Sequence, residues 1–261
     1  MVYESKNIRN VVLLGHPGSG KTTLAEDMLF EAKGISKRGR VEDGNTVSDY
    51  TSIEQTKGNS IFSTLMHAGW KDSKINIIDT PGYDDFIGEV LSSLKVADTA
   101  VMVLNAKSGV EVGTEIIWEY IEKFKTPAML VINQLDHEKA DYDNCVQQAI
   151  DRFGSHLLPV QYPLNQGTGF NSIVDALRMV MYVFPTGGGK PEKKPIPESE
   201  MPRALEMHNK LVEAAAENED GLMDKFFEQG TLDEADLTKG LTIAMANQQI
   251  FPIFCASGAG N

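Results

Sequence analysis

The feature that most constrains this chain is a glycine-rich pattern near its N-terminus. Residues 15–22 read GHPGSGKT and fit the consensus G-x-x-x-x-G-K-[ST]. An apolar run at 11–14 predicts a buried strand before the pattern, and residues 22–33 predict a helix after it. A chance match is expected in roughly one chain in a hundred of this length, and the strand–loop–helix context makes it rarer still. We therefore interpret residues 15–22 as a phosphate-binding loop.

The chemistry of this loop suits a nucleotide polyphosphate. Its backbone N–H groups and the positive end of the following helix dipole can face phosphate oxygens. The Lys21 ammonium is expected to reach the β- and γ-phosphates, and the Thr22 hydroxyl is expected to bind Mg²⁺. The candidate phosphate-binding residues are His16, Pro17, Gly18, Ser19, Gly20, Lys21, Thr22 and Thr23.

A second apolar run, at 74–78, ends in Asp79, Thr80, Pro81 and Gly82. A carboxylate at this strand end fits the acidic group that holds Mg²⁺ through water. The backbone N–H of Gly82 could lie near a γ-phosphate and make the segment sensitive to that group. By composition alone this segment would be an ordinary turn. Beside the phosphate loop, the metal-binding interpretation is favoured.

Residues 133–136, which read NQLD, follow another apolar run and fit the pattern N-[KQ]-x-D. The Asp136 carboxylate can accept two hydrogen bonds from guanine, whereas adenine has no such donor pair at that edge. Asn133 is expected to join this loop to the phosphate loop, and the stem of Gln134 could cover one face of the base. After the run at 251–255, the segment that contains Ser257 and Gly258 is expected to present backbone N–H groups to guanine O6. These motifs predict binding of GTP and GDP.

The order of apolar runs predicts an α/β fold of the P-loop NTPase type, with a mostly parallel sheet and helices on both faces. Strands are expected at 11–14, 74–78, 100–104, 128–132 and 251–255, with a hairpin partner at 61–66, and helices at 86–96, 112–124 and 141–153. The pattern then changes to a strand at 160–164, a loop at 185–198 and helices at 201–218 and 233–246. We predict a GTP-binding core, 1–157 and 249–261, interrupted by an inserted α+β subdomain, 158–248.

Composition narrows the cellular setting. The formal net charge of −13 argues against broad neutralisation of nucleic-acid phosphates. No apolar run approaches the length of about 18 residues that a membrane span requires. The two cysteines, Cys145 and Cys255, lack metal-ligand spacing, so we expect a reduced cytoplasmic compartment.

Taken together, these motifs resemble the N-terminal G domain of the elongation factor G family of translational GTPases. Residues 49–61, DYTSIEQTKGNSI, are similar to the family's first switch, and residues 79–86, DTPGYDDF, to its second switch. The resemblance implies GTP hydrolysis with Mg²⁺ on the ribosome, driving translocation. It also implies partners at the large-subunit factor-binding site and the stalk protein, a monomer, and a chain that is a fragment of a longer multidomain protein.

The resemblance assigns Lys21, Gly82 and position 83 to the catalytic group, and Thr22, Asp79 and position 60 to the metal. Ser60 stands where the family has Thr and keeps a hydroxyl, and Gly18 stands where the family often has Asp. Tyr83 replaces the family's His, which positions the attacking water. A phenol is neutral near pH 7, so we expect slow hydrolysis.

Three functions remain open at this stage. The first is a GTP-hydrolysing translocation factor, and the second is a GTP-dependent ribosome-binding switch with little or no hydrolysis. The third is a P-loop ATPase or small-molecule kinase in which the match at Asn133 and Asp136 is fortuitous. In the first two, residues 34–60 are expected to be poorly ordered without a γ-phosphate.

Overall fold

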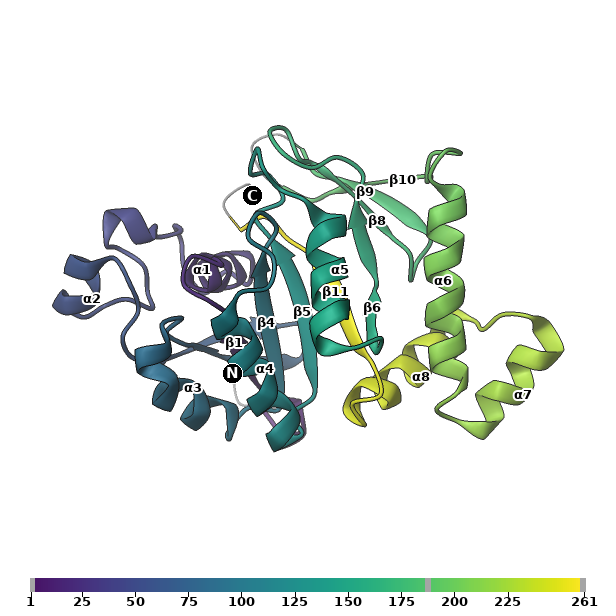
Figure 1. The fold of residues 1–261 in the computed structure, drawn as a ribbon, viewed down its shortest axis with the longest axis horizontal. Helices are drawn as coiled ribbons and strands as arrows, with labels where there is room; N and C mark the ends of the chain where they lie inside the picture. Colours follow the sequence, from purple (N-terminus) through teal and green to yellow (C-terminus); the bar gives the residue numbers. More distant parts are fainter. Residues whose placement is uncertain (1–2, 186–188, 259–261) are drawn as a thin grey trace.

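The computed structural model describes residues 3–185 and 189–258, and a seven-stranded sheet runs through its centre (Figure 1). The strand order is β2-β3-β1-β4-β5-β11-β6, and only the β2–β3 pair is antiparallel. The strands are β1 (Ile8–Leu14), β2 (Thr64–Trp70), β3 (Ser73–Asp79), β4 (Thr99–Asn105), β5 (Ala128–Asn133), β6 (Leu157–Pro159) and β11 (Phe251–Cys255). In a parallel sheet the carboxyl ends of the strands share one edge, so the predicted motifs meet there.

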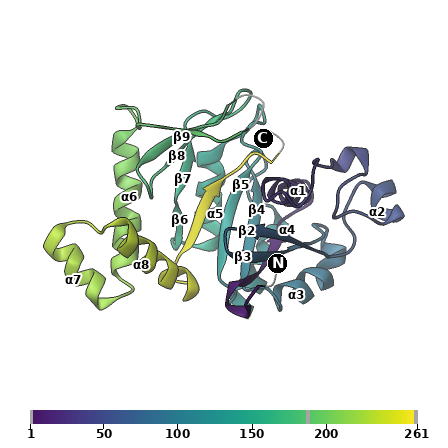
Figure 2. The same cartoon turned by 180° about the vertical axis from the view of Figure 1, so that it is seen from behind.

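Helices cover both faces of this sheet (Figures 1 and 2). Because side chains alternate along a strand, Leu13 of β1 packs with α1 (Lys21–Glu31), while its neighbours Val12 and Leu14 pack on the opposite face. That opposite face is covered by α3 (Ile87–Leu94), α4 (Val112–Phe124) and α5 (Tyr142–Phe153). Trp118 of α4 stacks on Phe153 of α5 with ring centroids 4.6 Å apart.

Short helices lie before β1 and in segments that connect the main elements. They are η1 (Ser5–Asn7), η2 (Val41–Asp43), α2 (Ser52–Lys57) and η3 (Asp84–Phe86). Helix α2 begins at a capping box, in which Thr51 and Glu54 satisfy each other's backbone N–H groups. Residues 34–60, for which the sequence indicated only a long polar loop, thus contain two short helices.

A separate four-stranded antiparallel sheet and three helices lie beyond the β6 edge of the main sheet (Figures 1 and 2). The strands are β7 (Gln161–Pro163), β8 (Ser172–Asp175), β9 (Val180–Val183) and β10 (Glu192–Lys194), in the order β10-β9-β8-β7. The helices are α6 (Met201–Ala216), α7 (Asp220–Gln229) and α8 (Glu234–Ala246), whose buried side chains include Leu211, Leu222 and Leu237.

The predicted fold class is confirmed: a mostly parallel sheet carries helices, and a separate antiparallel sheet accompanies it. One prediction was wrong, because residues 185–198 are not all loop and β10 pairs with β9. Four further elements of the sheets and helices, β6, β8, β9 and α7, were not predicted. The subdomain limits of 158 and 248 stay a prediction, and β6 spans the first of them. Across the described ranges, no helix has the length and apolar character needed to cross a membrane.

Candidate functional site

The phosphate loop links the end of β1 to the start of α1 and needs glycine at several positions. Gly15, Gly18 and Gly20 have φ of 141°, 78° and 90°, a region that side chains other than glycine rarely adopt. Gly20 precedes the first residue of α1. The first backbone N–H groups of that helix, which have no partner within the helix, therefore lie next to the loop. A side chain at Gly15 would collide with the carbonyl of Val103, and one at Gly20 with the amide of Asn133.

The Lys21 ammonium is held inside this loop. Its Nζ donates to the carbonyl oxygens of Gly15 at 2.8 Å and His16 at 3.1 Å. Burial lowers the pKa of Lys21 to about 8, and the nearby carboxylates of Asp79 and Asp49 partly oppose that shift. A buried cation with neutral partners is a site where an anion such as phosphate is strongly favoured.

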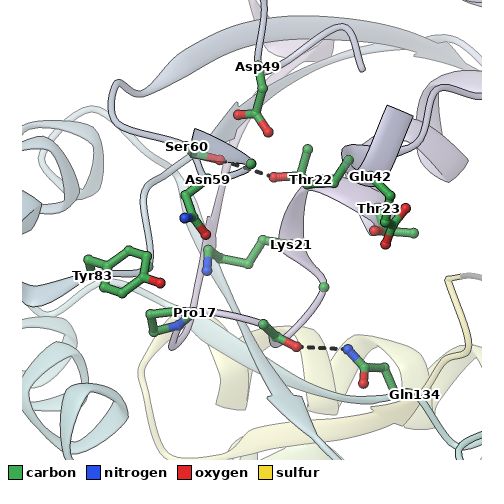
Figure 3. A pocket seen from close by; sticks show the side chains of 15 residues that line it. Pro17, Lys21, Thr22, Thr23, Glu42, Asp49, Asn59, Ser60, Tyr83 and Gln134 are labelled. Atoms are coloured by element: carbon green, nitrogen blue, oxygen red, sulfur yellow. Dashed lines mark hydrogen bonds between the residues drawn. The ribbon is translucent and has the colours of Figure 1, made fainter. Parts of the chain in front are cut away.

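The three residues predicted to hold a metal lie together. Thr22 Oγ1 donates to Asp79 Oδ2 at 2.7 Å and lies 3.3 Å from Ser60 Oγ (Figure 3). Ser48 also donates to Asp79 Oδ2, at 2.7 Å. Burial raises the pKa of Asp79 to about 6, against the opposing effect of these hydrogen bonds and of Lys21. A divalent cation would favour the charged carboxylate.

The oxygen atoms of this cluster suit Mg²⁺. Asp79 Oδ1 and Asp49 Oδ1 are buried and have no hydrogen-bond partner among the described residues. Since Thr22 gives its proton to Asp79, the lone pairs of its oxygen stay available to a cation. Mg²⁺ usually binds proteins through one or two carboxylates together with substrate phosphates. The described part of the chain has no cluster of three or more His, Cys, Asp or Glu that could hold a metal, and Mg²⁺ does not require one.

Asn133 joins three loops at the carboxyl edge of the sheet. It is buried, its Nδ2 donates to the Ser19 carbonyl at 3.0 Å, and its Oδ1 accepts from the Gly258 N–H at 3.0 Å. The phosphate loop, the loop after β5 and the loop after β11 are therefore held in one arrangement. This is the junction that the sequence predicted for Asn133.

Asp136 and Ser257 present polar atoms that the protein leaves unused. Asp136 is half-buried, and among the described residues its carboxylate makes no hydrogen bond or ion pair. Ser257 Oγ is buried and also has no partner there. The Gly258 N–H, in contrast, is already donated to Asn133. Among the predicted guanine-binding residues of these two loops, Asp136 and Ser257 are thus the ones whose side-chain polar atoms have no partner within the described part of the protein.

Gln134 contacts the phosphate loop through its amide. Its Nε2 donates to the Gly18 carbonyl at 2.8 Å, as Figure 3 shows. Its Oε1 accepts from Asn105 Nδ2 at 2.9 Å. Asn105 and Asp49 were missed as site residues. The signal for Asn105 was available, because it ends an apolar run at a strand end, as Asp79 and Asn133 do.

A cavity of about 220 Å³ opens between these groups. Its lining includes Pro17, Gly18, Gly20, Lys21, Thr22, Thr23, Asp49, Ser60, Gly82, Tyr83 and Gln134 (Figure 3). Of the predicted ligands, His16, Ser19, Asp79, Asn133, Asp136, Ser257 and Gly258 are not part of this lining.

His16 is buried, with Nδ1 2.7 Å from the Pro17 carbonyl and 3.4 Å from Glu111 Oε1. Burial lowers the pKa of His16, while the Pro17 carbonyl and Glu111 oppose that shift.

The second predicted switch forms one wall of the cavity. Gly82 lies so close to the phosphate loop that a Cβ there would be 2.7 Å from Lys21 Nζ and 2.7 Å from the Pro17 nitrogen. Tyr83 follows, is 44% exposed, and turns its hydroxyl toward the side of the cavity where Lys21 and Pro17 lie (Figure 3). The structure therefore brings the three predicted catalytic residues, Lys21, Gly82 and Tyr83, to one end of the cavity.

Comparisons with known proteins agree over nearly the whole chain. Residues 6–261 match the family model described as the elongation factor Tu GTP binding domain. The chain is 35% identical over 258 residues to elongation factor G of Mycoplasma pneumoniae, covering 98% of this chain and 37% of that protein. A crystal structure of a protein from Thermus thermophilus has a TM-score of 0.89 at 31% identity, over 97% of this chain and 38% of that chain. The chain thus spans little more than a third of the length of these relatives.

Proposed function

Because the chain belongs to the family of translational GTPases that carry the elongation factor Tu GTP-binding domain, we propose that it binds GTP and GDP with Mg²⁺ and hydrolyses GTP. We propose that it does so as the G domain of an elongation factor G-like protein that acts in ribosomal translocation. The observation that carries the proposal is the junction at Asn133, which joins the phosphate loop to the loops that follow β5 and β11.

Charged and polar groups would bind the phosphates and the metal at one end of the site. The Lys21 ammonium would neutralise phosphate oxygens, and the N-terminal N–H groups of α1 would add hydrogen bonds. The hydroxyls of Thr22 and Ser60 and the Asp79 carboxylate would hold Mg²⁺, with Asp49 as a further nearby carboxylate. The bound metal supplies positive charge to the phosphates where negative charge develops during hydrolysis.

The base end rests on Asp136 and Ser257. The unused carboxylate of Asp136 would accept the N1–H and the exocyclic amine of guanine. The backbone N–H of Ser257 would donate to guanine O6, since the N–H groups of Ala256 and Gly258 are already donated within the protein. An ATPase or small-molecule kinase would leave the Asp136 carboxylate without donors in the bound complex. The proposal therefore excludes adenine nucleotides as tight ligands.

A second candidate function follows from Tyr83, which occupies the position of the family's His. Its hydroxyl turns toward the cavity in Figure 3 and makes no hydrogen bond among the described residues, so no hydrogen bond fixes this orientation. A chain that binds GTP but positions the attacking water poorly would act as a GTP-dependent ribosome-binding switch with little or no hydrolysis. Both candidates place the protein in the cytoplasm as a monomer.

The helices α6 to α8 are the proposed docking surface for the ribosomal stalk protein, since the segment 186–250 carries an excess of acidic side chains. Acidic surfaces steer basic partners and give salt-dependent association rates. Binding to ribosomes with and without the stalk protein, at two salt concentrations, tests this contact. Equal binding in all four conditions would remove the docking proposal and leave nucleotide binding untouched.

The central experiment compares equilibrium affinities for GDP, GTP and ATP in the presence of Mg²⁺. We expect GDP and GTP to bind at least about a hundredfold more tightly than ATP, because hydrogen bonds to a charged carboxylate contribute about 1.5–3 kcal/mol each. Lys21→Ala should weaken both guanine nucleotides. Tight ATP binding by the unaltered protein would favour the ATPase or kinase alternative.

A further inference from the structure

The orientation of the Asn105 side chain is determined by a backbone group. Asn105 ends β4 and is almost fully buried. Its Oδ1 accepts from the Lys107 N–H at 2.9 Å. A backbone N–H can only donate, so the atom facing it must be the amide oxygen. The Asn105 NH₂ group therefore faces the other way, toward Gln134 Oε1 at 2.9 Å and the Gly18 carbonyl at 3.3 Å.

The orientation of the Asn105 amide determines the orientation of the Gln134 amide. Because the Asn105 amide presents a donor, the oxygen of Gln134 turns toward it, and the Gln134 NH₂ group turns toward the phosphate loop. There it donates to the Gly18 carbonyl at 2.8 Å. The Gly18 carbonyl thus accepts from two side-chain amides that come from different strand ends. Gln134 itself has a positive φ of 60°, so its backbone conformation is already unusual.

We infer that Asn105 and Gln134 form a matched amide pair that holds the phosphate loop against the loop after β5, with Asn105 as the positioning residue that selects which end of Gln134 faces Gly18. The inference rests on the proposed guanine-nucleotide binding and deepens it. Gly18 and Gln134 both line the cavity. Separation of these two loops would therefore open the site, and the pair sets how slowly a bound nucleotide leaves.

The pair predicts a specific incompatibility. In Gln134→Lys the ammonium would face the Asn105 NH₂ group, so a donor would meet a donor. Rotation of the Asn105 amide by 180° would relieve that contact, but it would leave the Lys107 N–H facing another donor. In Asn105→Asp, a carboxylate would face the Gln134 and Gly18 oxygens, so acceptors would meet acceptors.

The two substitutions together remove both conflicts. In the double variant one carboxylate oxygen accepts from the Lys107 N–H, and the other accepts from the introduced ammonium, which also reaches the Gly18 carbonyl. A charge-assisted pair then replaces the neutral amide contact. If each residue had only an independent structural role, the double variant would not recover GDP binding, because the losses caused by the two substitutions would add.

The experiment measures GDP affinity and GDP dissociation rate for the unaltered protein, Gln134→Lys, Asn105→Asp and the double variant. Gln147→Lys is the matched control, because it adds the same charge at an exposed site on α5, where the Gln147 amide donates a hydrogen bond to Asp151. We expect each single variant to release GDP about tenfold faster, which corresponds to about 1.4 kcal/mol. The double variant should return to within about threefold of the unaltered protein, and the control should not change.

Two results would overturn the inference. One is a double variant about a hundredfold weaker, as independent effects would give, and the other is a Gln134→Lys variant that binds GDP as well as the unaltered protein. If a single variant does not fold, Gln134→Met removes the link to Gly18 without adding a charge. Unchanged GDP dissociation in that variant also overturns the inference. Failure of the unaltered protein to bind GDP would instead contradict the proposed function.

Discussion

Asp27 is a residue whose charge the fold tolerates poorly. It lies on α1, its Oδ1 accepts from Arg38 at 2.7 Å, and its Oδ2 is buried without a partner among the described residues. Burial raises the pKa of Asp27 from 3.8 to about 6, with added repulsion from Glu31 and Glu26, and Arg38 opposes the shift without cancelling it. Asp27 is not among the proposed nucleotide or metal ligands, so its titration reports on the nucleotide-free fold.

The raised pKa predicts a pH-dependent stability with a definite sign. Between about pH 4 and pH 6 the folded protein binds more protons at Asp27 than the unfolded chain does. Its contribution to stability is therefore fully present below about pH 4 and is lost as pH rises through 6. In Asp27→Asn the free energy of unfolding should rise relative to the unaltered protein across that window, by roughly 1–3 kcal/mol. Urea unfolding of both nucleotide-free proteins at pH 4, 5, 6 and 7 measures this, and a difference independent of pH would contradict it.

Asp136 is the residue that should select the base. Its carboxylate accepts two donors from guanine, whereas an amide at this position has one acceptor and one donor. Asp136→Asn should weaken GDP binding by at least about tenfold and should favour xanthosine diphosphate, since the amide can donate to xanthine O2. Competition binding with both diphosphates measures the change. Parallel loss of affinity for the two would show that Asp136 supports the loop without reading the base.

At the scale of single residues, the members of each motif could be predicted because they lie within a few positions of one another in the sequence. The contacts of Asn105 with Gly18 and of Glu26 with Val47 could not be predicted, because the partners are distant in sequence. Asn105 contacts Gly18 across 87 residues, and Glu26 contacts Val47 across 21. Outside recognised motifs such as the one that contains Asn133, a single sequence carries no signal for which loop returns to which carboxylate or amide.

The segment 34–60 shows how such contacts organise a whole element. Glu26 of α1 is buried and accepts from the backbone N–H groups of Gly39, at 2.8 Å, and Val47. Glu54 accepts from the N–H groups of Ile61 and Phe62 at 3.0 and 3.1 Å. The first contact fixes residues 39–47 against α1 without any nucleotide atom. The second leaves Ser60 beside Thr22, where a γ-phosphate and a metal would act.

Hydrogen exchange should therefore divide this segment into two parts. Residues 48–60 are expected to gain protection when a non-hydrolysable GTP analogue and Mg²⁺ replace GDP, because Ser60 can close over the metal only when the terminal phosphate is present. Residues 39–47 should stay protected in both states, so the loss of order that the sequence predicted for all of 34–60 is not expected in this part. Equal protection of residues 48–60 in the two states would contradict the switch.

Glu26→Gln should release residues 39–47, because one of the two carboxylate oxygens is replaced by a donor that repels a backbone N–H. Exchange there should become about tenfold faster in every nucleotide state, the factor that corresponds to losing one hydrogen bond of about 1.4 kcal/mol. Glu31→Gln, on the same helix but exposed, is the matched control. Exchange that is the same in both variants would show that Glu26 does not anchor the segment.

The elements that the sequence predicted are those with a buried apolar pattern. Strands β1, β3, β4, β5 and β11 are apolar because both faces of the sheet are covered. Strand β10 reads Glu-Lys-Lys and is exposed, and it forms because its backbone pairs with β9. Such an edge strand is stabilised by its neighbour's hydrogen bonds, which no local apolar pattern reports.

On the scale of the whole molecule, the rate of GTP hydrolysis on the ribosome separates the two candidate functions. Hydrolysis depends on positioning a water in line with the γ-phosphate and on charge around it. Tyr83 immediately precedes η3 at the cavity end that holds Lys21, with no hydrogen bond among the described residues to fix its hydroxyl. A histidine can hydrogen-bond the water and can carry positive charge near neutral pH, whereas a phenol stays neutral. We therefore expect intact nucleotide binding and slow turnover.

Tyr83→His in the natural protein should raise ribosome-stimulated GTP hydrolysis on the order of tenfold or more, since a positioned acid–base group contributes about 10²–10⁴-fold in favourable cases. GDP affinity should change little, because Tyr83 is 44% exposed and lines the end of the cavity that is proposed to take the γ-phosphate, which GDP lacks. Tyr83→Phe is the control that removes only the hydroxyl: a rate below that of the unaltered protein would mean that the phenol orients water to some extent. If Tyr83→His leaves the rate unchanged while the natural protein turns over as fast as elongation factor G, tyrosine is a competent substitute. The switch without hydrolysis would then be excluded, and the translocating GTPase would stand.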